Sequence, residues 1–193
     1  MKNSNKPPVI CFSGPVSDSV AWEDHAVPTL MQQPIFRDRR GSFTVLGAGT
    51  ATRQTNLSVS NYNVIRGMHW QAGDAQITKY VRCIGGRIYD VVVDMRPKSP
   101  TFGGWKGFEL VGGASTTGNR QDGLVVPKGF AHGFQVLSNN ATVLYEQDGV
   151  WSPDDERAVN PFCPEIGIQW FRSTVDPTVS EKDELAPGLS FFK

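Results

Sequence analysis

Two segments of the sequence place a histidine among glycine and apolar residues, where packing alone does not require one. In NVIRGMHWQ, at 63–71, Arg66 and His69 are three residues apart, and His132 lies in PKGFAHGF. The chain has only three histidines, and two of them stand in these segments. An imidazole transfers protons near neutral pH or ligates metals, whereas a guanidinium binds anionic groups. The two segments therefore predict proton-transfer or metal chemistry next to a site for an anionic ligand.

The spacing of the second segment bears on that choice. Pro127, Gly129 and His132 give the pattern P-x-G-x-x-H, and His69 stands on an earlier expected strand. This pair of motifs resembles the cupins, small β-barrels that often hold a metal ion. In metal-binding cupins the first motif supplies H-x-H and a downstream glutamate.

The metal ligands of that pattern are missing here. The second histidine position is Gln71, and the glutamate position is Lys79 counted back from Gly86, or near Gln76 counted from Gln71. Divalent ions prefer neutral imidazoles and carboxylates, and an ammonium group would repel them. We therefore expect no metal, and a barrel that binds a charged organic substrate.

Composition limits the class of protein. The chain has 193 residues, which suits one domain, and 19 basic and 19 acidic residues give it a formal net charge of zero. This balance argues against a nucleic-acid partner. The apolar runs are too short for a membrane span, and MKNSNKPPVICFSGPV does not resemble a secretory signal. Cys11, Cys83 and Cys163 form no C-x-x-C pair, so we expect a cytoplasmic protein without disulfides.

The elements that must position these residues are expected to be strands. Twenty glycines and thirteen prolines indicate many turns, and alternation is more common than a 3.6-residue period. We predict an all-β domain over 34–193, a cupin-type double-stranded β-helix or jelly roll with short helical turns. Residues 1–33 are predicted to be an extended N-terminal arm and not a separate domain.

Three local predictions are specific enough to test. Gly85-Gly86 between two β-rich runs predicts a tight hairpin, because glycine tolerates the positive φ of such turns. A short helix is predicted to begin in SPDDERAV, at 152–159, and a strand is predicted for IGIQW, at 166–170. Lys79 shares a strand face with Val81 and Cys83, so an inward lysine would need a ligand or a carboxylate.

Five segments taken together resemble the dTDP-4-dehydrorhamnose 3,5-epimerase family. They are QTNLSVSNYNVIRGMHWQ, KYVRCIGGRIYDVVVDMRPKSPTFGGW, VPKGFAHGFQVLS, VLYEQDGVWSPDDE and VSEKD, in the order and spacing of that family. The resemblance implies epimerisation of dTDP-4-dehydro-6-deoxyglucose at carbons 3 and 5 without any cofactor. A base removes a proton next to the ketone, an enolate forms, and an acid returns a proton to the other face.

The resemblance also implies a role for individual residues. His69 matches the general base, Asp183 the carboxylate that orients it, Lys79 the cation beside the ketone oxygen, and Tyr145 the general acid. The residues that match ligand-binding positions are Arg40, Gln54, Asn56, Arg66, Asp90, His132, Trp151, Glu156 and Lys182. Among these, Asp90 is the expected partner of His132, and Trp151 the aromatic that stacks on thymine.

Two positions depart from the family pattern. Val45 replaces a glutamate that contacts the nucleotide, which leaves the preference for thymidine open. Trp70 replaces a smaller aromatic beside His69, and it serves either packing or the choice of sugar. From composition alone, Tyr145 could equally be a core residue, and Arg66 could pair with Asp90 or Asp94.

Three other functions remain compatible with the sequence. One is a 3- or 5-mono-epimerase or keto-isomerase acting on a related nucleotide-linked sugar. Another is a non-catalytic module that binds sugar nucleotides, and the third is a metal-dependent cupin. The family resemblance further implies a homodimer that exchanges N-terminal strands, with a dTDP-sugar as the small-molecule partner.

Overall fold

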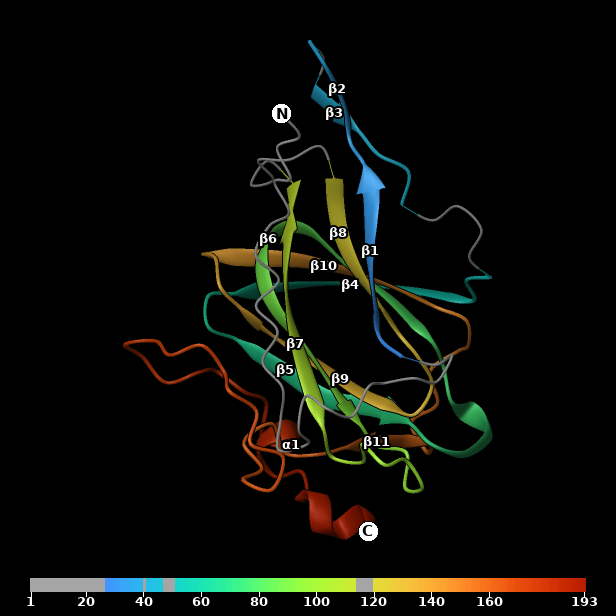
Figure 1. The fold of residues 1–193 in the computed structure, drawn as a ribbon. Helices are drawn as coiled ribbons and strands as arrows, with labels where there is room; N and C mark the ends of the chain where they lie inside the picture. Colours follow the sequence, from blue (N-terminus) through green and yellow to red (C-terminus); the bar gives the residue numbers. More distant parts are fainter. Residues whose placement is uncertain (1–26, 40, 47–50, 114–119) are drawn as a thin grey trace.

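A computed structural model describes residues 27–39, 41–46, 51–113 and 120–193, which form two facing β-sheets (Figure 1). Helical structure in these ranges is limited to α1 (Glu181–Glu184) and 3-10 turns at Gly73–Ala75 and Leu189–Phe192. The prediction of an all-β fold with short helical turns is confirmed. The strands are β1 (Thr29–Pro34), β2 (Phe36–Asp38), β3 (Gly41–Phe43), β4 (Gln54–Asn61), β5 (Ile65–Gln71), β6 (Lys79–Asp94), β7 (Trp105–Gly112), β8 (Arg120–Val126), β9 (Phe130–Val136), β10 (Asn140–Gln147) and β11 (Glu156–Ala158).

The long strand β6 belongs to both sheets. Its second half pairs with β7 and β9 in sheet I, which has the order β7–β6–β9–β5–β11. Its first half pairs with β8 and β10 in sheet II, which has the order β1–β8–β6–β10–β4. All of these pairings are antiparallel, and the two-sheet arrangement is that of a cupin-type jelly roll.

The predicted hairpin at Gly85-Gly86 is wrong, because β6 continues through both glycines. They lie instead at the corner where the strand passes from sheet II to sheet I. Gly86 has a φ of +80°, and a Cβ at this position would lie 2.2 Å from the backbone oxygen of Asn140. Two glycines in a β-rich sequence thus mark a bend, which the sequence does not distinguish from a turn.

A register shift at the same corner reverses the alternation of the strand. Thr142 of β10 faces Gly85, and the next residue, Val143, faces Cys83, so β6 holds one extra residue there. The inward-facing residues of β6 therefore change from odd to even numbers. For this reason Lys79 in sheet II and Asp90 in sheet I both face the space between the sheets.

The main hydrophobic core fills one part of the space between the two sheets. It contains Val81 and Cys83 from sheet II and Ile88 and Val92 from sheet I, all completely buried. Phe134 of β9 and the partly buried Tyr145 pack against the same cluster. The other part of this space is polar and holds the cavity described below.

A second core lies on the outer face of sheet I and is covered by the C-terminal segment. Tyr89 and Val91 of β6 are completely buried there, together with Ile166 and Leu189 from the chain beyond β11. The segment is also hydrogen-bonded to β5, since Ile65 donates its backbone N–H to the Thr178 oxygen at 2.9 Å. Figure 1 shows this segment beside β5 and β11, at the end of the molecule opposite the β2–β3 hairpin.

Two of the other local predictions are wrong. Residues 153–155 form a turn that leads into the short strand β11, so no helix begins in SPDDERAV. Residues 166–170 form no strand, because this segment packs its apolar side chains onto sheet I without joining a ladder.

Strand β4 has an inverted alternation of polar and apolar residues. Its inward-facing residues are all polar, whereas Leu57 and Val59 on the outward face are 61% and 62% exposed. A strand over an apolar core shows the opposite pattern. The inward-facing side of β4 therefore lines a polar space.

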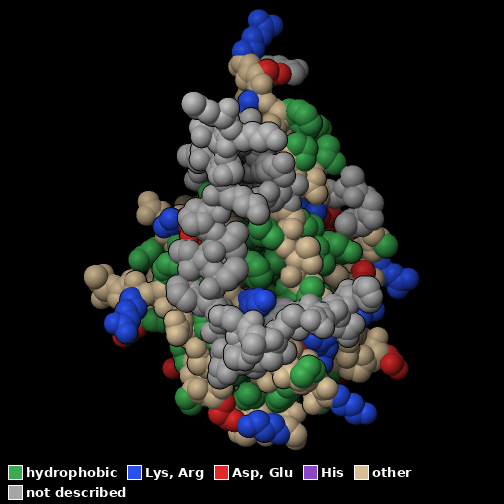
Figure 2. Space-filling model, viewed as in Figure 1, with side chains coloured by type: hydrophobic (Ala, Val, Ile, Leu, Met, Phe, Trp, Pro, Cys, Tyr) green, Lys and Arg blue, Asp and Glu red, His purple; other side chains and the backbone are tan. Residues whose placement is uncertain are grey.

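The face shown in Figure 2 carries scattered charges of both signs around hydrophobic side chains. None of the helices in the described ranges has the length and apolar character needed to cross a membrane.

The corner at Gly86 should be essential for stability. We expect Gly86→Ala to lower the free energy of unfolding by about 3 kcal/mol or more, because the new Cβ would meet backbone atoms in addition to the strain of a positive φ. Gly73→Ala is the matched control: its φ is also positive, at +59°, but no heavy atom lies within 4 Å of the new Cβ. Urea denaturation measures both changes, and equal losses in the two variants would contradict this role of the corner.

Candidate active site

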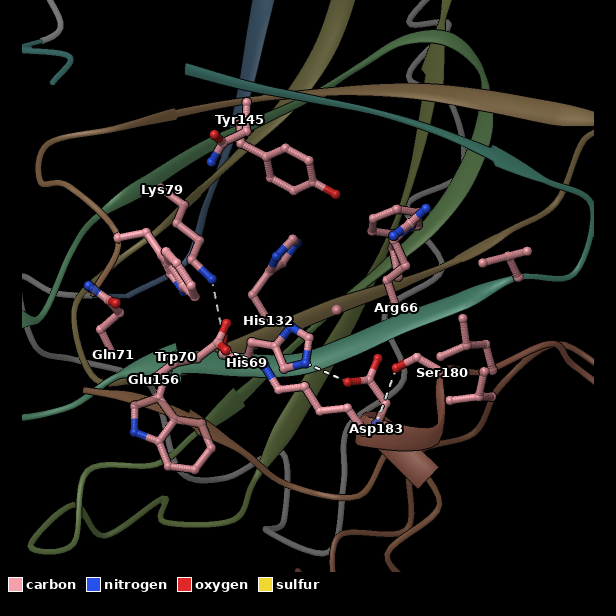
Figure 3. A pocket seen from close by; sticks show the side chains of 18 of the residues that line it. Arg66, His69, Trp70, Gln71, Lys79, His132, Tyr145, Glu156, Ser180 and Asp183 are labelled. Carbon is pink, nitrogen blue, oxygen red and sulfur yellow. Dashed lines mark hydrogen bonds and ion pairs between the residues drawn. The ribbon is translucent and has the colours of Figure 1, made fainter. Parts of the chain in front are cut away.

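A cavity of about 560 Å³ opens between the two sheets and beside the C-terminal segment. Most residues predicted to act on or bind a substrate line it, and they come from both sheets and from α1 (Figure 3). The predicted residues that line the cavity are His69, Lys79, Tyr145, Asp183, Asn56, Arg66, His132, Trp151, Glu156 and Lys182.

His69 is paired with a buried carboxylate at the cavity wall. Its Nε2 lies 2.6 Å from Oδ1 of Asp183, and the other oxygen of this carboxylate accepts a hydrogen bond from the Gly67 backbone at 3.1 Å. Asp183 is buried, whereas His69 is partly exposed to the cavity. The carboxylate therefore fixes the ring orientation of His69.

The C-terminal segment delivers Asp183 to this position. Ser180 caps α1, its side chain accepting a hydrogen bond from the Asp183 backbone. Burial tends to raise the pKa of Asp183, but the hydrogen bond and charge of His69 and the Gly67 N–H outweigh it and hold this pKa below its ordinary value. Asp183 is therefore ionised at neutral pH.

An irregularity in β5 brings Arg66 and His69 to the same cavity. Residues three apart in a regular strand point to opposite faces. Here the register between β5 and β9 shifts between Arg66 and His69, at Gly67, which has a φ of +112°. Arg66 lies at the other end of the cavity from Lys79 in Figure 3, and its Nε donates to Ser60 at 2.8 Å.

The alternative pairing of Arg66 with a structural carboxylate is not observed among the described residues. Asp90 pairs with His132, and Asp94 pairs with Arg96. The guanidinium of Arg66 is exposed and lines the cavity. It is therefore placed to bind an anionic group of a ligand.

Lys79 is a cation with an unusually low proton affinity. Desolvation by burial lowers its pKa from 10.5 to about 8, against the opposing charges of Glu156 and Asp90. Its Nζ donates a hydrogen bond to the backbone oxygen of His69 at 3.2 Å. A positive charge thus lies next to the histidine, and it is retained at neutral pH.

Tyr145 reaches the cavity from sheet II, opposite His69 in sheet I. Burial raises the pKa of its phenol, although a hydrogen bond with Ser58 and the charge of Arg66 lower it in part. The phenol oxygen lies 3.2 Å from the Ser58 hydroxyl, and the ring meets His132 edge-on at 6.2 Å. The phenol is therefore a protonated hydroxyl group on the wall facing the histidines.

His132 and Asp90 form a buried pair on the floor of the cavity. The imidazole Nε2 lies 2.9 and 3.0 Å from the two carboxylate oxygens of Asp90. Burial raises the pKa of Asp90, and the charge and hydrogen bond of His132 oppose this shift. The predicted pairing of these two residues is observed, and Asp90 itself lies behind His132 and does not line the cavity.

The remaining predicted binding residues lie at the rim or nearby. Glu156 and Lys182 form an ion pair, and Glu156 has a lowered pKa because this bond and the charge of His69 outweigh its burial. Gln54 accepts a hydrogen bond from the Trp151 backbone at 2.9 Å and donates one to Asn56 at 2.8 Å. Gln54 supports the cavity wall without lining it.

Three positions singled out in the sequence lie elsewhere. Arg40 falls outside the described residues. Val45 is exposed beyond β3 and does not line the cavity. Trp70 reaches the cavity edge, but its indole belongs to the second core and meets Phe192 edge-on at 5.0 Å. Its main contact is therefore with the C-terminal segment.

Sequence reasoning missed several polar residues of the site. Ser58, Ser60 and Ser180 hold Tyr145, Arg66 and α1, respectively. The two serines of β4 alternate with Leu57 and Val59 in QTNLSVSN, so the inverted alternation of this strand was the signal that could have identified them. Gln147, buried in the cavity wall, gave no such signal.

The donor set of the cavity suits proton transfer. Gln71, at the position of a metal ligand in metal cupins, is bonded through both amide atoms to the backbone of Ala75 and Ser152. In the described ranges no group of three or more His, Cys, Asp or Glu side chains could hold a metal ion. A histidine–aspartate pair and a phenol on facing walls, with a lysine beside the histidine, can exchange protons on two faces of one bound molecule.

Comparisons with known proteins agree with this arrangement. Residues 28–190 match the family model of dTDP-4-dehydrorhamnose 3,5-epimerase. The enzyme of that name from Salmonella typhimurium is 39% identical over 170 residues, which cover 83% of this chain and 89% of that protein.

Two solved structures are also similar. The Legionella pneumophila dTDP-6-deoxy-D-glucose-3,5-epimerase, in complex with dTDP-4-keto-L-rhamnose, has a TM-score of 0.76 at 33% identity, covering 86% of this chain and 89% of that one. A 3'-monoepimerase from Streptomyces bikiniensis, in complex with dTDP-quinovose, has a TM-score of 0.76 at 29% identity, covering 84% of each chain.

Fold, cavity and matches together define an isomerase built on a cupin-type β fold. The chain belongs to the dTDP-4-dehydrorhamnose 3,5-epimerase family.

The low pKa of Lys79 should appear in the pH dependence of stability. Native Lys79 loses its proton near pH 8, whereas in the unfolded chain it keeps the proton up to about pH 10.5. Between these values the unfolded state binds more protons, so stability should rise with pH, by about 3 kcal/mol in total. Lys79→Met should lack this contribution.

Urea denaturation of both proteins at pH 7.5 and pH 10 measures this difference. Other groups titrate equally in the two proteins, so they cancel when one pH effect is subtracted from the other. An identical pH effect in both proteins would mean that Lys79 has an ordinary pKa.

Proposed function

We propose that the protein inverts carbons 3 and 5 of dTDP-4-dehydro-6-deoxyglucose to give dTDP-4-dehydro-L-rhamnose. The observation that carries this proposal is the placement of His69, paired with Asp183, and Tyr145 on facing sheets of one cavity. Inversion of a carbon needs a proton acceptor on one side of the sugar and a donor on the other. The two residues supply these groups from opposite walls.

The reaction starts at a hydrogen acidified by the 4-ketone. Neutral His69 takes the proton from carbon 3 or carbon 5, and Asp183 stabilises the imidazolium that forms. The electron pair moves onto the ketone oxygen and gives an enolate. Lys79, still charged below its pKa of about 8 and hydrogen-bonded to the backbone oxygen of His69, stabilises this negative charge.

A proton from Tyr145 then returns to the opposite face of the same carbon. Burial favours the protonated phenol in the resting enzyme, because it raises the pKa of Tyr145. Each carbon loses one proton and gains one, and the substrate already carries its ketone. The reaction therefore balances without a metal or an organic cofactor.

The nucleotide is proposed to bind toward the rim. Arg66 offers an exposed guanidinium for the diphosphate, whose oxygens match its fork of donors. Trp151, which is 46% exposed and held by Gln54, offers its face to the base. Arg40, Asn56, His132, Glu156 and Lys182 complete the proposed binding set, and Asp90 orients His132.

A heavy-water assay tests the catalytic assignment. Incubation of the protein with the keto-sugar in deuterium oxide should label carbons 3 and 5, as read by NMR. We expect His69→Ala to abolish exchange at both carbons, because no base remains. Tyr145→Phe should retain exchange on the face of His69 but lose inversion by at least about a hundredfold. Full turnover by His69→Ala would refute the assignment.

A mono-epimerase is the second candidate, favoured by the similarity to the 3'-monoepimerase of Streptomyces bikiniensis. The same assay decides between them, since label at carbon 3 alone identifies a 3-mono-epimerase. Binding of the sugar nucleotide without any exchange would instead indicate a non-catalytic module.

We also propose that the protein acts as a cytoplasmic homodimer. Cys163 is a free buried thiol, which suits a reducing compartment. Exposed apolar side chains lie on the outward face of β4, at Leu57 and Val59, and on the β2–β3 hairpin. Such surfaces are typical of interfaces.

The dimer should be sensitive to charge on the outward face of β4. Leu57→Glu combined with Val59→Glu is expected to shift the protein to a monomer in analytical ultracentrifugation, because the apolar contact is lost. Thr55→Glu on the same face, near the strand end, is the control for added charge alone. A wild-type monomer, or a double variant that stays dimeric, would contradict the proposed interface.

A further inference from the structure

Gln147 is a buried amide in the cavity wall whose oxygen has no partner among the described residues. Its side chain is only 6% exposed, and it lines the cavity near the end of β10. Its Oε1 accepts no hydrogen bond from the part of the chain that the structure describes. A buried acceptor without a donor is unfavourable, and most such groups in proteins are satisfied.

Other glutamines around the cavity do not share this property. Gln71 uses both amide atoms to join β5 to the Ala75 and Ser152 backbone, and Gln54 joins Trp151 to Asn56. These two side chains hold loops and strands together. Gln147 therefore differs from them because it lines the cavity with a buried acceptor that no described residue satisfies.

The register of sheet II places Gln147 next to the proposed reacting groups. It is directly opposite Lys79 of β6 on one side and Gln54 of β4 on the other. Tyr145 is two residues earlier and faces the same way. Neighbouring strands lie about 4.8 Å apart, so Gln147 faces the part of the ligand that lies beside Lys79.

The chemistry of the ligand beside Lys79 is limited if the proposed function holds. Lys79 faces the ketone oxygen, and the ketone of a 4-keto-6-deoxysugar has a hydroxyl on one flanking carbon and a methyl on the other. An amide oxygen accepts a hydrogen bond from the hydroxyl and gains nothing from the methyl. A free acceptor next to Lys79 therefore matches the hydroxyl on carbon 3.

We propose that Gln147 is a specificity-determining residue whose Oε1 accepts a hydrogen bond from the 3-hydroxyl of the bound sugar. The inference rests on the proposed epimerase function and names which nucleotide-linked ketosugars this site accepts. Sugars with a free hydroxyl next to the ketone bind with that hydroxyl toward β10. Sugars that lack it leave the buried oxygen of Gln147 unsatisfied and are rejected.

The test compares two substrates in two proteins. The substrates are dTDP-4-dehydro-6-deoxyglucose and its 3-deoxy analogue, and the proteins are wild type and Gln147→Met, which keeps the length of the side chain without the acceptor. Solvent deuterium incorporation gives kcat/KM for each, at the carbon that the wild type labels. Dividing the substrate preference of one protein by that of the other cancels the intrinsic reactivity of each sugar.

We expect the preference for the 3-hydroxy sugar to fall at least about tenfold in Gln147→Met, as for a lost hydrogen bond to a buried acceptor. Gln54→Met is the matched control, in the same row of sheet II: its acceptor is already occupied by Trp151, so it should leave the preference unchanged. Binding of dTDP alone should be the same in wild type and Gln147→Met.

Two outcomes would overturn the inference: an unchanged preference, or a loss of dTDP affinity as large as the loss for the sugar nucleotide. Absence of exchange in the wild type would instead contradict the proposed epimerase function. In that event the affinities of the two sugar nucleotides for wild type and Gln147→Met still decide the role of Gln147. If Gln147→Met does not fold, Gln147→Val serves as the second variant without an acceptor.

Discussion

The hydrogen bond between His69 and Asp183 makes the geometry of the site depend on the packing of the C-terminal segment. Asp183 stands far along the chain from His69, and it reaches the histidine only because the C-terminal segment packs on the outer face of sheet I. Trp70 and Phe192 take part in that packing. The second core thus supports the proposed catalytic pair indirectly, since it holds the segment that presents the carboxylate. Loosening this segment would leave the histidine in the cavity without its orienting partner.

The apolar core and the polar cavity share the space between the two sheets. The apolar cluster between the sheets fixes their spacing, and the remaining space between them becomes a polar cavity. Ion pairs offset the burial of charged groups there, as for His132 with Asp90 and Glu156 with Lys182. For Lys79 the nearby charges of Glu156 and Asp90 offset burial only in part, so desolvation lowers its pKa to about 8. Some stability is given up so that a cation lies where negative charge is proposed to develop.

Much of the site was predictable because strands were bounded by clear turn residues and the motifs were co-linear with those of a known family. His69, Lys79, Tyr145 and Asp183 could be named by that route, and the structure gathers them in one cavity. The local errors have a common cause. Two glycines, or a proline followed by acids, look the same in sequence whether they begin a turn, a bend or a strand, and only the neighbouring strands decide among these.

The sequence by itself determined the all-β class and the family, and it supplied the residues proposed to react, because residue types and spacing encode them directly. Tertiary structure alone decided which wall each group occupies. Arg66 and His69 face one cavity because the register shifts at Gly67, and β6 reverses its inward face at the Gly86 corner. The unpartnered oxygen of Gln147 could likewise be recognised only in the tertiary structure. Whether a buried amide has a partner depends on atoms from other strands, which no local pattern specifies.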